Sequence, residues 1–197
     1  MKLLKNLLTI MTLSVVLLSC SKDDETPPAQ TIYEEENFLN EFLFLSKLNH
    51  TVVASGYGEG EKGLKFKSKV KGIIKAATLN LPPTQTNIII RIWDMETEKV
   101  IGAVTTNYGS VGANNTLLKF SKPIEITPNK EYMLTFDGRL GFFHAKLNDA
   151  AVEYPKECGN ITILGYYNSP AYLTVPPFSR EDNEYFGDCS FIFQQVN

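Results

Sequence analysis

The side chains best suited to binding a ligand in this 197-residue chain lie near its C-terminal end. Tyrosines stand there among Asn, Ser, Arg and Asp residues, in segments typical of loops and strand ends. Sugar-binding β-sandwiches stack pyranose rings on exposed aromatic faces and hold the hydroxyls with Asp, Asn and Arg. We therefore predict a surface for a glycan or a partner protein, formed by Tyr166, Tyr167, Tyr172, Arg180, Asp182 and Tyr185. The alternative is that these rings belong to a sheet core.

Cys158 and Cys189 are the two cysteines in the body of the chain. In an exported protein, which folds in an oxidising compartment, such a pair predicts a disulfide bond. The bond would stabilise the fold by roughly 3–4 kcal/mol in the chain-entropy model. Two separate buried thiols are the alternative.

Motifs of common enzymes are incomplete in this sequence. Gly58–Gly63 has the letters of a dinucleotide loop, but it precedes a predicted strand, and its glutamates would repel phosphate. His50 and His144 lack the spacing of a zinc site. Gly109–Gly112 misses the pattern of a serine nucleophile elbow by one residue. We predict no catalytic residues, no metal and no cofactor, and keep a hydrolase with a scattered site as an alternative.

The N-terminal segment has the pattern of an export signal. Lys2 and Lys5 are followed by the uncharged, mostly apolar run Leu7–Leu18, which is shorter than the roughly 20 residues that span a bilayer. Leu17–Cys20 then resembles the lipobox of bacterial lipoproteins, in which the chain is cut before the cysteine and the cysteine is acylated. We predict a lipoprotein signal peptide over residues 1–19 and lipidation of Cys20. An ordinary secretory signal with an incidental cysteine is the alternative.

A tether is expected over residues 20–31. Ser21–Glu25 is acidic and resembles the export signal of surface-exposed lipoproteins in some Gram-negative phyla, although a solvated tether has the same composition. Thr26–Thr31 contains two prolines and no core-forming residue, which predicts a stiff, extended spacer. The protein is thus expected at the cell outer membrane, held in membrane lipid by acylated Cys20. It would be surface-exposed if the acidic signal operates.

The composition is that of one globular domain with a tail. The chain is 43% hydrophobic and has a formal net charge of −3 at pH 7, which excludes disorder of the whole chain. A balance of 19 basic against 22 acidic residues gives no support for a surface that binds the phosphate backbone. Nucleic acid is therefore not an expected partner.

Residues 32–197 are predicted to form this domain mainly from strands. Leu64, Phe66, Ser68 and Val70 alternate with four lysines, as in a strand with one buried and one solvated face. Turn signals separate the further predicted strands, which are Ile73–Leu81, Asn87–Asp94, Lys99–Thr106, Thr116–Phe120 with Ile124–Ile126, Tyr132–Asp137, Phe142–Leu147, Ile161–Tyr167 and Ser190–Val196. Many short strands without long helices between them predict a sandwich or a barrel.

One short helix is expected near the start of the domain, over Glu34–Leu45. Its acidic residues Glu34–Glu36 suit a first helical turn. Its apolar residues share one face, which consists of Phe38, Leu39, Phe42 and Leu43.

Four segments between about Gly63 and Asp137 carry a resemblance to a known family. They are, in order, Gly63–Phe66, Ile90–Asp94, Leu118–Phe120 with Pro123-Ile124, and Thr127–Tyr132. Together they resemble the family of domains of unknown function numbered 4082 and its relatives, with Asn129 in place of the family's turn glycine. The resemblance implies a jelly-roll-like β-sandwich of a kind often attached to extracellular or carbohydrate-related proteins. It implies no catalytic residues.

We expect an all-β protein with a single antiparallel, jelly-roll-like β-sandwich and a short N-terminal helix. Its expected function is that of a non-catalytic lipoprotein of the cell envelope whose sandwich binds a glycan or a partner protein. A structural or accessory subunit that docks on an outer-membrane protein complex is the first alternative, and the hydrolase is the second.

Lipidation of Cys20 predicts that the Cys20→Ala variant leaves the membrane. The variant has no thiol to acylate, so the exported domain should appear in the soluble fraction instead of the membrane fraction. Fractionation of cells combined with labelling by a palmitate analogue measures both effects. Continued lipid labelling of the variant would contradict the assignment.

Overall fold

The structure is a computed structural model that describes residues 31–55, 60–82, 85–108, 116–146, 150–169 and 174–197. The predicted signal peptide, Cys20, nearly all of the tether, Gly109–Gly112 and Tyr172 lie outside the described residues.

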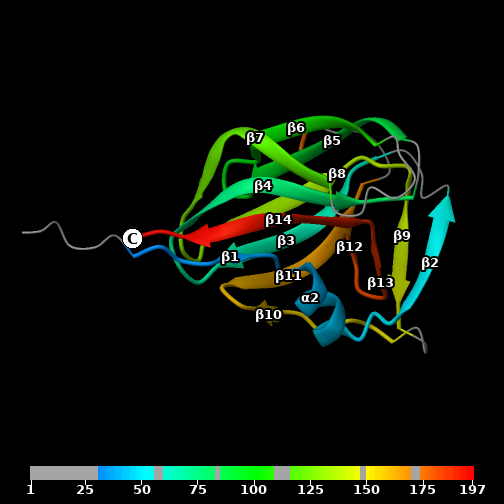
Figure 1. The fold of residues 1–197 in the computed structure, drawn as a ribbon. Helices are drawn as coiled ribbons and strands as arrows, with labels where there is room; N and C mark the ends of the chain where they lie inside the picture. Colours follow the sequence, from blue (N-terminus) through cyan, green and yellow to red (C-terminus); the bar gives the residue numbers. More distant parts are fainter. Residues whose placement is uncertain (1–30, 56–59, 83–84, 109–115, 147–149, 170–173) are drawn as a thin grey trace, which may run out of the picture. The chain divides into compact units, whose positions relative to one another are not determined.

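The described domain is built from antiparallel sheets and one short helix (Figure 1). One sheet has the strand order β1 (Glu35–Glu36), β14 (Asp188–Gln195), β4 (Gly72–Asn80) and β7 (Thr116–Ile126). The largest has the order β10 (Lys156–Cys158), β11 (Ile161–Asn168), β3 (Lys62–Ser68), β8 (Glu131–Phe136), β5 (Gln85–Asp94) and β6 (Lys99–Tyr108), with β12 (Ser179–Glu181) also paired to β11. The smallest has the order β13 (Glu184–Phe186), β9 (Leu140–Ala145) and β2 (His50–Ser55).

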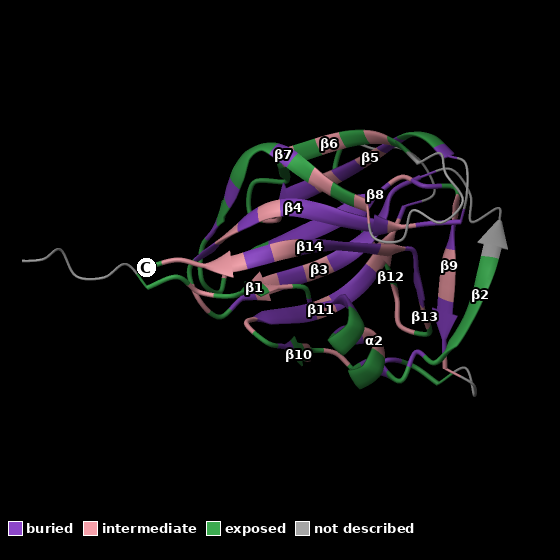
Figure 2. Cartoon of the chain, in the orientation of Figure 1, coloured by how far each residue is buried: buried purple, intermediate pink, exposed green. Residues whose placement is uncertain are grey.

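The core lies between the β14-containing sheet and the β3-containing sheet. The ring centroids of Phe66 on β3 and Phe191 on β14 are 4.7 Å apart, and Phe38 lies 4.8 Å from Phe191 on another side. Figure 2 shows the buried residues running along β4, β14, β3 and β11. The predicted antiparallel β-sandwich is confirmed.

Alternation of apolar and polar residues located the strands correctly. All nine predicted segments are strands, with ends displaced by a few residues. The two parts predicted around residues 116–126 form one continuous strand, β7. Lys65 and Lys67 of β3 lie on its more accessible face, where Lys65 forms an ion pair of 2.6 Å with Glu131, whereas Lys62 at the start of the strand is buried. Lys69, just beyond the strand, pairs with Glu157. These contacts agree with a solvated face.

The helix is shorter than predicted, because its expected first turn is a strand. Glu35 and Glu36 form β1, which pairs with the C-terminal part of β14. The helix α2 (Leu39–Ser46) begins where the Asn37 side chain accepts a hydrogen bond of 3.1 Å from the backbone N–H of Leu39. The predicted apolar face is confirmed, since Phe38, Leu39 and Phe42 are buried in the core and Leu43 packs against it.

The residues that carry the family resemblance have structural roles. A Cβ atom at Gly63 would lie 1.9 Å from the backbone oxygen of Leu134, so β3 and β8 can approach this closely only at glycine. Asn129 has φ of 62°. Asn tolerates this left-handed conformation better than most residues.

Within the described residues, no helix combines the length and the apolar character needed to cross a membrane.

The predicted disulfide bond between Cys158 and Cys189 is wrong, because both are free, buried thiols. Cys158 ends β10 at the edge of the largest sheet, whereas Cys189 lies on β14 opposite Leu79 of β4. The oxidising compartment would permit a bond, but a bond also requires Cα atoms roughly 4.4–6.8 Å apart. Burial raises the pKa of Cys158 to about 12 and raises that of Cys189 further, so neither forms a reactive thiolate at neutral pH.

Free thiols predict that the Cys20→Ala variant takes up two alkyl groups when it is denatured without reductant. The folded protein should react slowly, because burial holds both thiols protonated. Intact-mass measurement after iodoacetamide treatment, with and without denaturant, distinguishes the cases. If the denatured protein stays unmodified until reductant is added, Cys158 and Cys189 form a disulfide bond after all.

Candidate functional site

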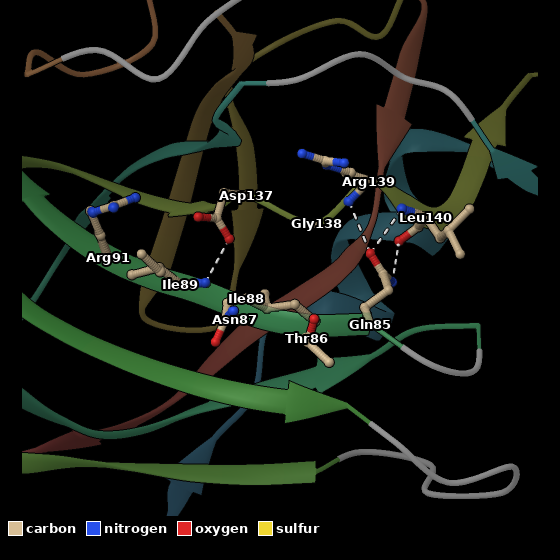
Figure 3. A pocket seen from close by; sticks show the side chains of 10 residues that line it. All are labelled: Gln85, Thr86, Asn87, Ile88, Ile89, Arg91, Asp137, Gly138, Arg139 and Leu140. Carbon is tan, nitrogen blue, oxygen red and sulfur yellow. Dashed lines mark hydrogen bonds between the residues drawn. The ribbon is translucent and has the colours of Figure 1, made fainter.

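A pocket with several polar side chains lies where the first half of β5 faces the turn between β8 and β9 (Figure 3). Its volume is about 770 Å³. It is lined by Gln85, Thr86, Asn87, Ile88, Ile89, Arg91, Asp137, Gly138, Arg139 and Leu140. Pockets of a few hundred Å³ or more with a few convergent polar groups are the usual form of a small-molecule site.

A β-bulge in β5 shapes one wall of the pocket. The pairing of β5 with β6 shifts register between Gln85 and Ile88, which leaves Thr86 and Asn87 exposed. Asn87 has φ of 56°, and its backbone N–H donates a hydrogen bond of 2.9 Å to the Asn107 side chain. Bulges of this kind re-aim side chains next to functional sites.

Gln85 holds the opposite wall in place. Its Oε1 accepts hydrogen bonds of 2.9 Å from the backbone N–H groups of Arg139 and Leu140, and its Nε2 donates one of 2.8 Å to the Leu140 carbonyl. Figure 3 shows all three bonds. The Gln85 side chain is buried, and both its oxygen and its nitrogen form hydrogen bonds to the turn, so its role is to fix the turn.

Asp137 and Arg91 provide charge inside the pocket. The Asp137 carboxylate accepts a hydrogen bond of 2.6 Å from the backbone N–H of Ile89. Burial raises the pKa of Asp137, while the Ile89 bond and the charge of Arg91 act in the opposite direction. In the view of Figure 3, Asp137 of the turn after β8 lies between Arg91 of β5 and Arg139. The pocket thus presents one carboxylate between cationic groups.

A chain of hydrogen bonds leads from Arg91 into the protein. The Arg91 guanidinium donates to Glu61 Oε1 at 2.7 Å, and the Thr135 hydroxyl donates to the same oxygen at 2.6 Å. Thr135 Oγ1 accepts in turn from the Trp93 indole N–H at 3.0 Å. These side chains share the face of β5 and β8 that is opposite to the Ile92 and Leu134 face. Trp93 is buried, but it lies outside the main hydrophobic cluster.

Two of the predicted binding tyrosines belong to the core. Tyr166 is 0% exposed and Tyr185 is 1% exposed, and their rings meet edge to face at 5.5 Å between centroids. The prediction that they stack on a ligand is wrong for these two residues, because no face of either ring is accessible. Tyr172 lies outside the described residues.

The other predicted residues form a smaller surface cluster. Tyr167 and Arg180 are cross-strand partners on β11 and β12, and Arg180 forms an ion pair of 2.7 Å with Asp182. The Arg180 guanidinium also lies 5.4 Å from the ring centroid of Tyr154, a residue that the sequence did not single out. The structure therefore brings together three of the six predicted residues, and two of them, Arg180 and Asp182, form an ion pair with each other.

Glu61, Arg91 and Asp137 were not predicted from the sequence to belong to a binding site. Arg91 had a detectable signal, since it is a lone charge in the apolar segment Ile88–Trp93. Asp137-Gly138 has the pattern of a turn, and it does lie between two strands, but this pattern does not indicate a binding site. Glu61 was counted against phosphate binding, and no local pattern shows that its carboxylate is buried.

His144 forms a second hydrogen-bond chain. One ring nitrogen contacts Thr51 Oγ1 at 3.0 Å and the other contacts Asp188 at 2.6 Å, the order of groups found in hydrolytic triads. Thr51 and His144, however, are direct cross-strand partners on β2 and β9, and Asp188 also accepts from Asn80 of β4 at 3.0 Å. We interpret the chain as a joint between the smallest sheet and the β14-containing sheet.

Metal binding has no support in the described part of the chain, where no three His, Cys, Asp or Glu side chains are grouped to hold an ion. Neither a known protein family nor a curated protein matches the chain. Its described residues form an antiparallel β-sandwich with a pocket beside the turn between β8 and β9.

Removal of the Gln85 amide should loosen the pocket. The Gln85→Ala variant leaves two backbone N–H groups and one carbonyl without their partner, so we expect a loss of about 1–3 kcal/mol in the free energy of unfolding. Urea denaturation measures it, with Thr86→Ala, an exposed neighbour, as the control. Equal stability of the two variants would show that the turn does not depend on Gln85.

Proposed function

We propose that this protein is a non-catalytic, lipid-anchored protein of the cell envelope whose β-sandwich binds a saccharide in the pocket between Arg91 and Asp137. The observation that carries the proposal is the convergence of a carboxylate and guanidinium groups in a cavity of about 770 Å³. A saccharide hydroxyl donates one hydrogen bond and accepts others. A site with a carboxylate acceptor beside guanidinium donors satisfies both roles.

The lining also explains how such a ligand would be held without aromatic stacking. Thr86 and Asn87 are exposed at the bulge and offer further polar groups, while Ile88 and Ile89 supply apolar surface. The polar groups stand on β5 and on a turn that Gln85 clamps. Such a pre-formed site binds with little ordering cost.

Binding is favoured over hydrolysis by the state of the carboxylates. Most glycosidases need two carboxyl groups on either side of the scissile bond, one as an acid and one as a base or nucleophile. Among the described residues that line this pocket, Asp137 is the one carboxylate. Glu61 is 2% exposed, and its Oε1 is engaged by Arg91 and Thr135, so it is not free for either role.

Attachment to the outer membrane rests on the residues before the domain. The lipobox-like segment Leu17–Cys20 supplies the acylation site, and the residues between Cys20 and the domain supply a spacer. A glycan-binding domain on such a tether would hold polymer close to the cell envelope.

Binding can be measured with the soluble Cys20→Ala chain on a glycan array and then by calorimetry. Arg139→Gln should weaken binding by about tenfold, the loss expected for a hydrogen bond from a charged group. Arg180→Gln is the matched control, because Arg180 is an equally exposed arginine in the Tyr167 cluster. We expect it to leave the affinity unchanged.

Other outcomes would redirect the assignment. Loss of binding in Arg180→Gln alone would show that the glycan binds at the Tyr167 cluster, which also contains Tyr154 and Arg180. No glycan binding, together with a stable crosslinked partner in cells, would favour the accessory subunit of an outer-membrane complex.

A further inference from the structure

We propose that the pocket selects neutral saccharides that present neighbouring hydroxyls, and that buried Glu61 is the positioning residue that holds Arg91 for this contact. The inference rests on the proposed function and specifies its ligand class. It follows from the contacts of Arg91, from the charges around it and from the burial of the groups behind it.

Glu61 restricts the Arg91 side chain to one orientation. The Glu61 side chain is 2% exposed, whereas that of Arg91 is 23% exposed, so the ion pair joins a buried anchor to an accessible guanidinium. Thr135 is fully buried and donates to the same Glu61 oxygen. The anchor is thus itself held by β8, and Arg91 gains a fixed direction that a surface arginine lacks.

Arg91 keeps donors for a ligand. A guanidinium has five N–H donors in a planar fork. The bond to Glu61 is its one hydrogen bond among the described residues. Asp137 accepts from the backbone of Ile89 and lies close enough for the charge of Arg91 to lower its pKa. A donor and an acceptor therefore stand side by side, which matches two neighbouring hydroxyls of one sugar ring.

The two carboxylates nearest to Arg91 disfavour an anionic group at its guanidinium, although Arg139 and Lys62 place positive charge on the other side of Asp137. Glu61 already compensates Arg91 at 2.7 Å, and Asp137 adds a second carboxylate. A ligand carboxylate bound to Arg91 would stand near both, and like charges repel more strongly where water is partly excluded. A hydroxyl pair can use the same donor and acceptor without this repulsion.

Thr135 connects the anchor to the single tryptophan of the chain. Trp93 donates to Thr135, which donates to Glu61, which holds Arg91. A ligand that changes the position or polarisation of Arg91 should alter this chain of bonds. Because indole emission responds to its hydrogen bond and local field, Trp93 fluorescence is a built-in reporter of the pocket.

The ligand class can be tested by calorimetry on the Cys20→Ala chain. The probes are mannotriose, cellotriose and galactotriose and the uronate trimer of matching linkage for each, which differs only in a carboxylate at the exocyclic carbon. We expect a neutral trisaccharide to bind about tenfold more tightly than its uronate counterpart, as for one unfavourable charge contact. Tighter binding of the uronate would overturn the inference about charge.

The positioning role can be tested with two variants of the ion pair. Glu61→Gln removes the charge of the anchor, and Arg91→Lys keeps an ion pair with Glu61 but loses the planar fork. Each should weaken binding of the neutral probe by about tenfold or more. If Glu61→Gln does not fold cooperatively, the affinity of Arg91→Lys for the neutral probe is the test of the ion pair. Unchanged affinity in the folded variants would refute the role of Glu61.

A fluorescence titration separates positioning from a general structural effect. Thr135→Val removes the hydroxyl link, and Thr135→Ser retains it. The neutral probe should change Trp93 emission in the parent and in Thr135→Ser, but not in Thr135→Val, in which calorimetry should detect weaker binding because Glu61 has lost the Thr135 hydroxyl. A persistent emission change in Thr135→Val would refute the coupling. Absence of calorimetric binding in the parent would instead refute the proposed function itself.

Discussion

Packing of aromatic rings between β3 and β14 is the contact on which the rest of the described structure depends. Phe66 and Phe191 meet at 4.7 Å, and Phe38, just before the helix, packs on Phe191 from a distant part of the sequence. Removal of one such buried ring typically costs about 3–5 kcal/mol, a large share of the stability of a domain of this size. Because β3 pairs with β8 and β8 with β5, this packing also sets the position of both walls of the pocket.

The same strands separate two chemistries on their two faces. On one face of β5 and β8, Ile90, Ile92 and Leu134 join the hydrophobic cluster. On the other, Arg91, Trp93 and Thr135 join Glu61 in a hydrogen-bonded chain. Burial of a charged pair is costly unless its hydrogen bonds are completed. Thr135 helps to complete those of Glu61, so the polar chain is compatible with a stable sheet and gives Arg91 a defined place.

Much of the fold could be predicted because alternation is a local property of a strand. The nine predicted strands and the apolar face of the helix follow from residue types at short spacing. The short strands β1, β2, β10, β12 and β13 were missed, since β1, β10, β12 and β13 span only two or three residues and β2, with the sequence His-Thr-Val-Val-Ala-Ser, shows no alternation. Glu35 and Glu36 suited a helix by charge, yet their pairing with β14, at the other end of the chain, made them a strand.

The candidate site depended on distances that no local pattern contains. Composition by itself determined a globular domain, and residue order determined that it is built mainly from strands and which face of each strand is apolar, because alternation depends on neighbours in sequence. The tertiary structure alone decided that Tyr166 and Tyr185 are core residues, that Cys158 and Cys189 stay unpaired, and that Glu61 lies beside Arg91. Each of these depends on which strands become neighbours across the sheets, and the spacing of residues along the chain does not carry that information.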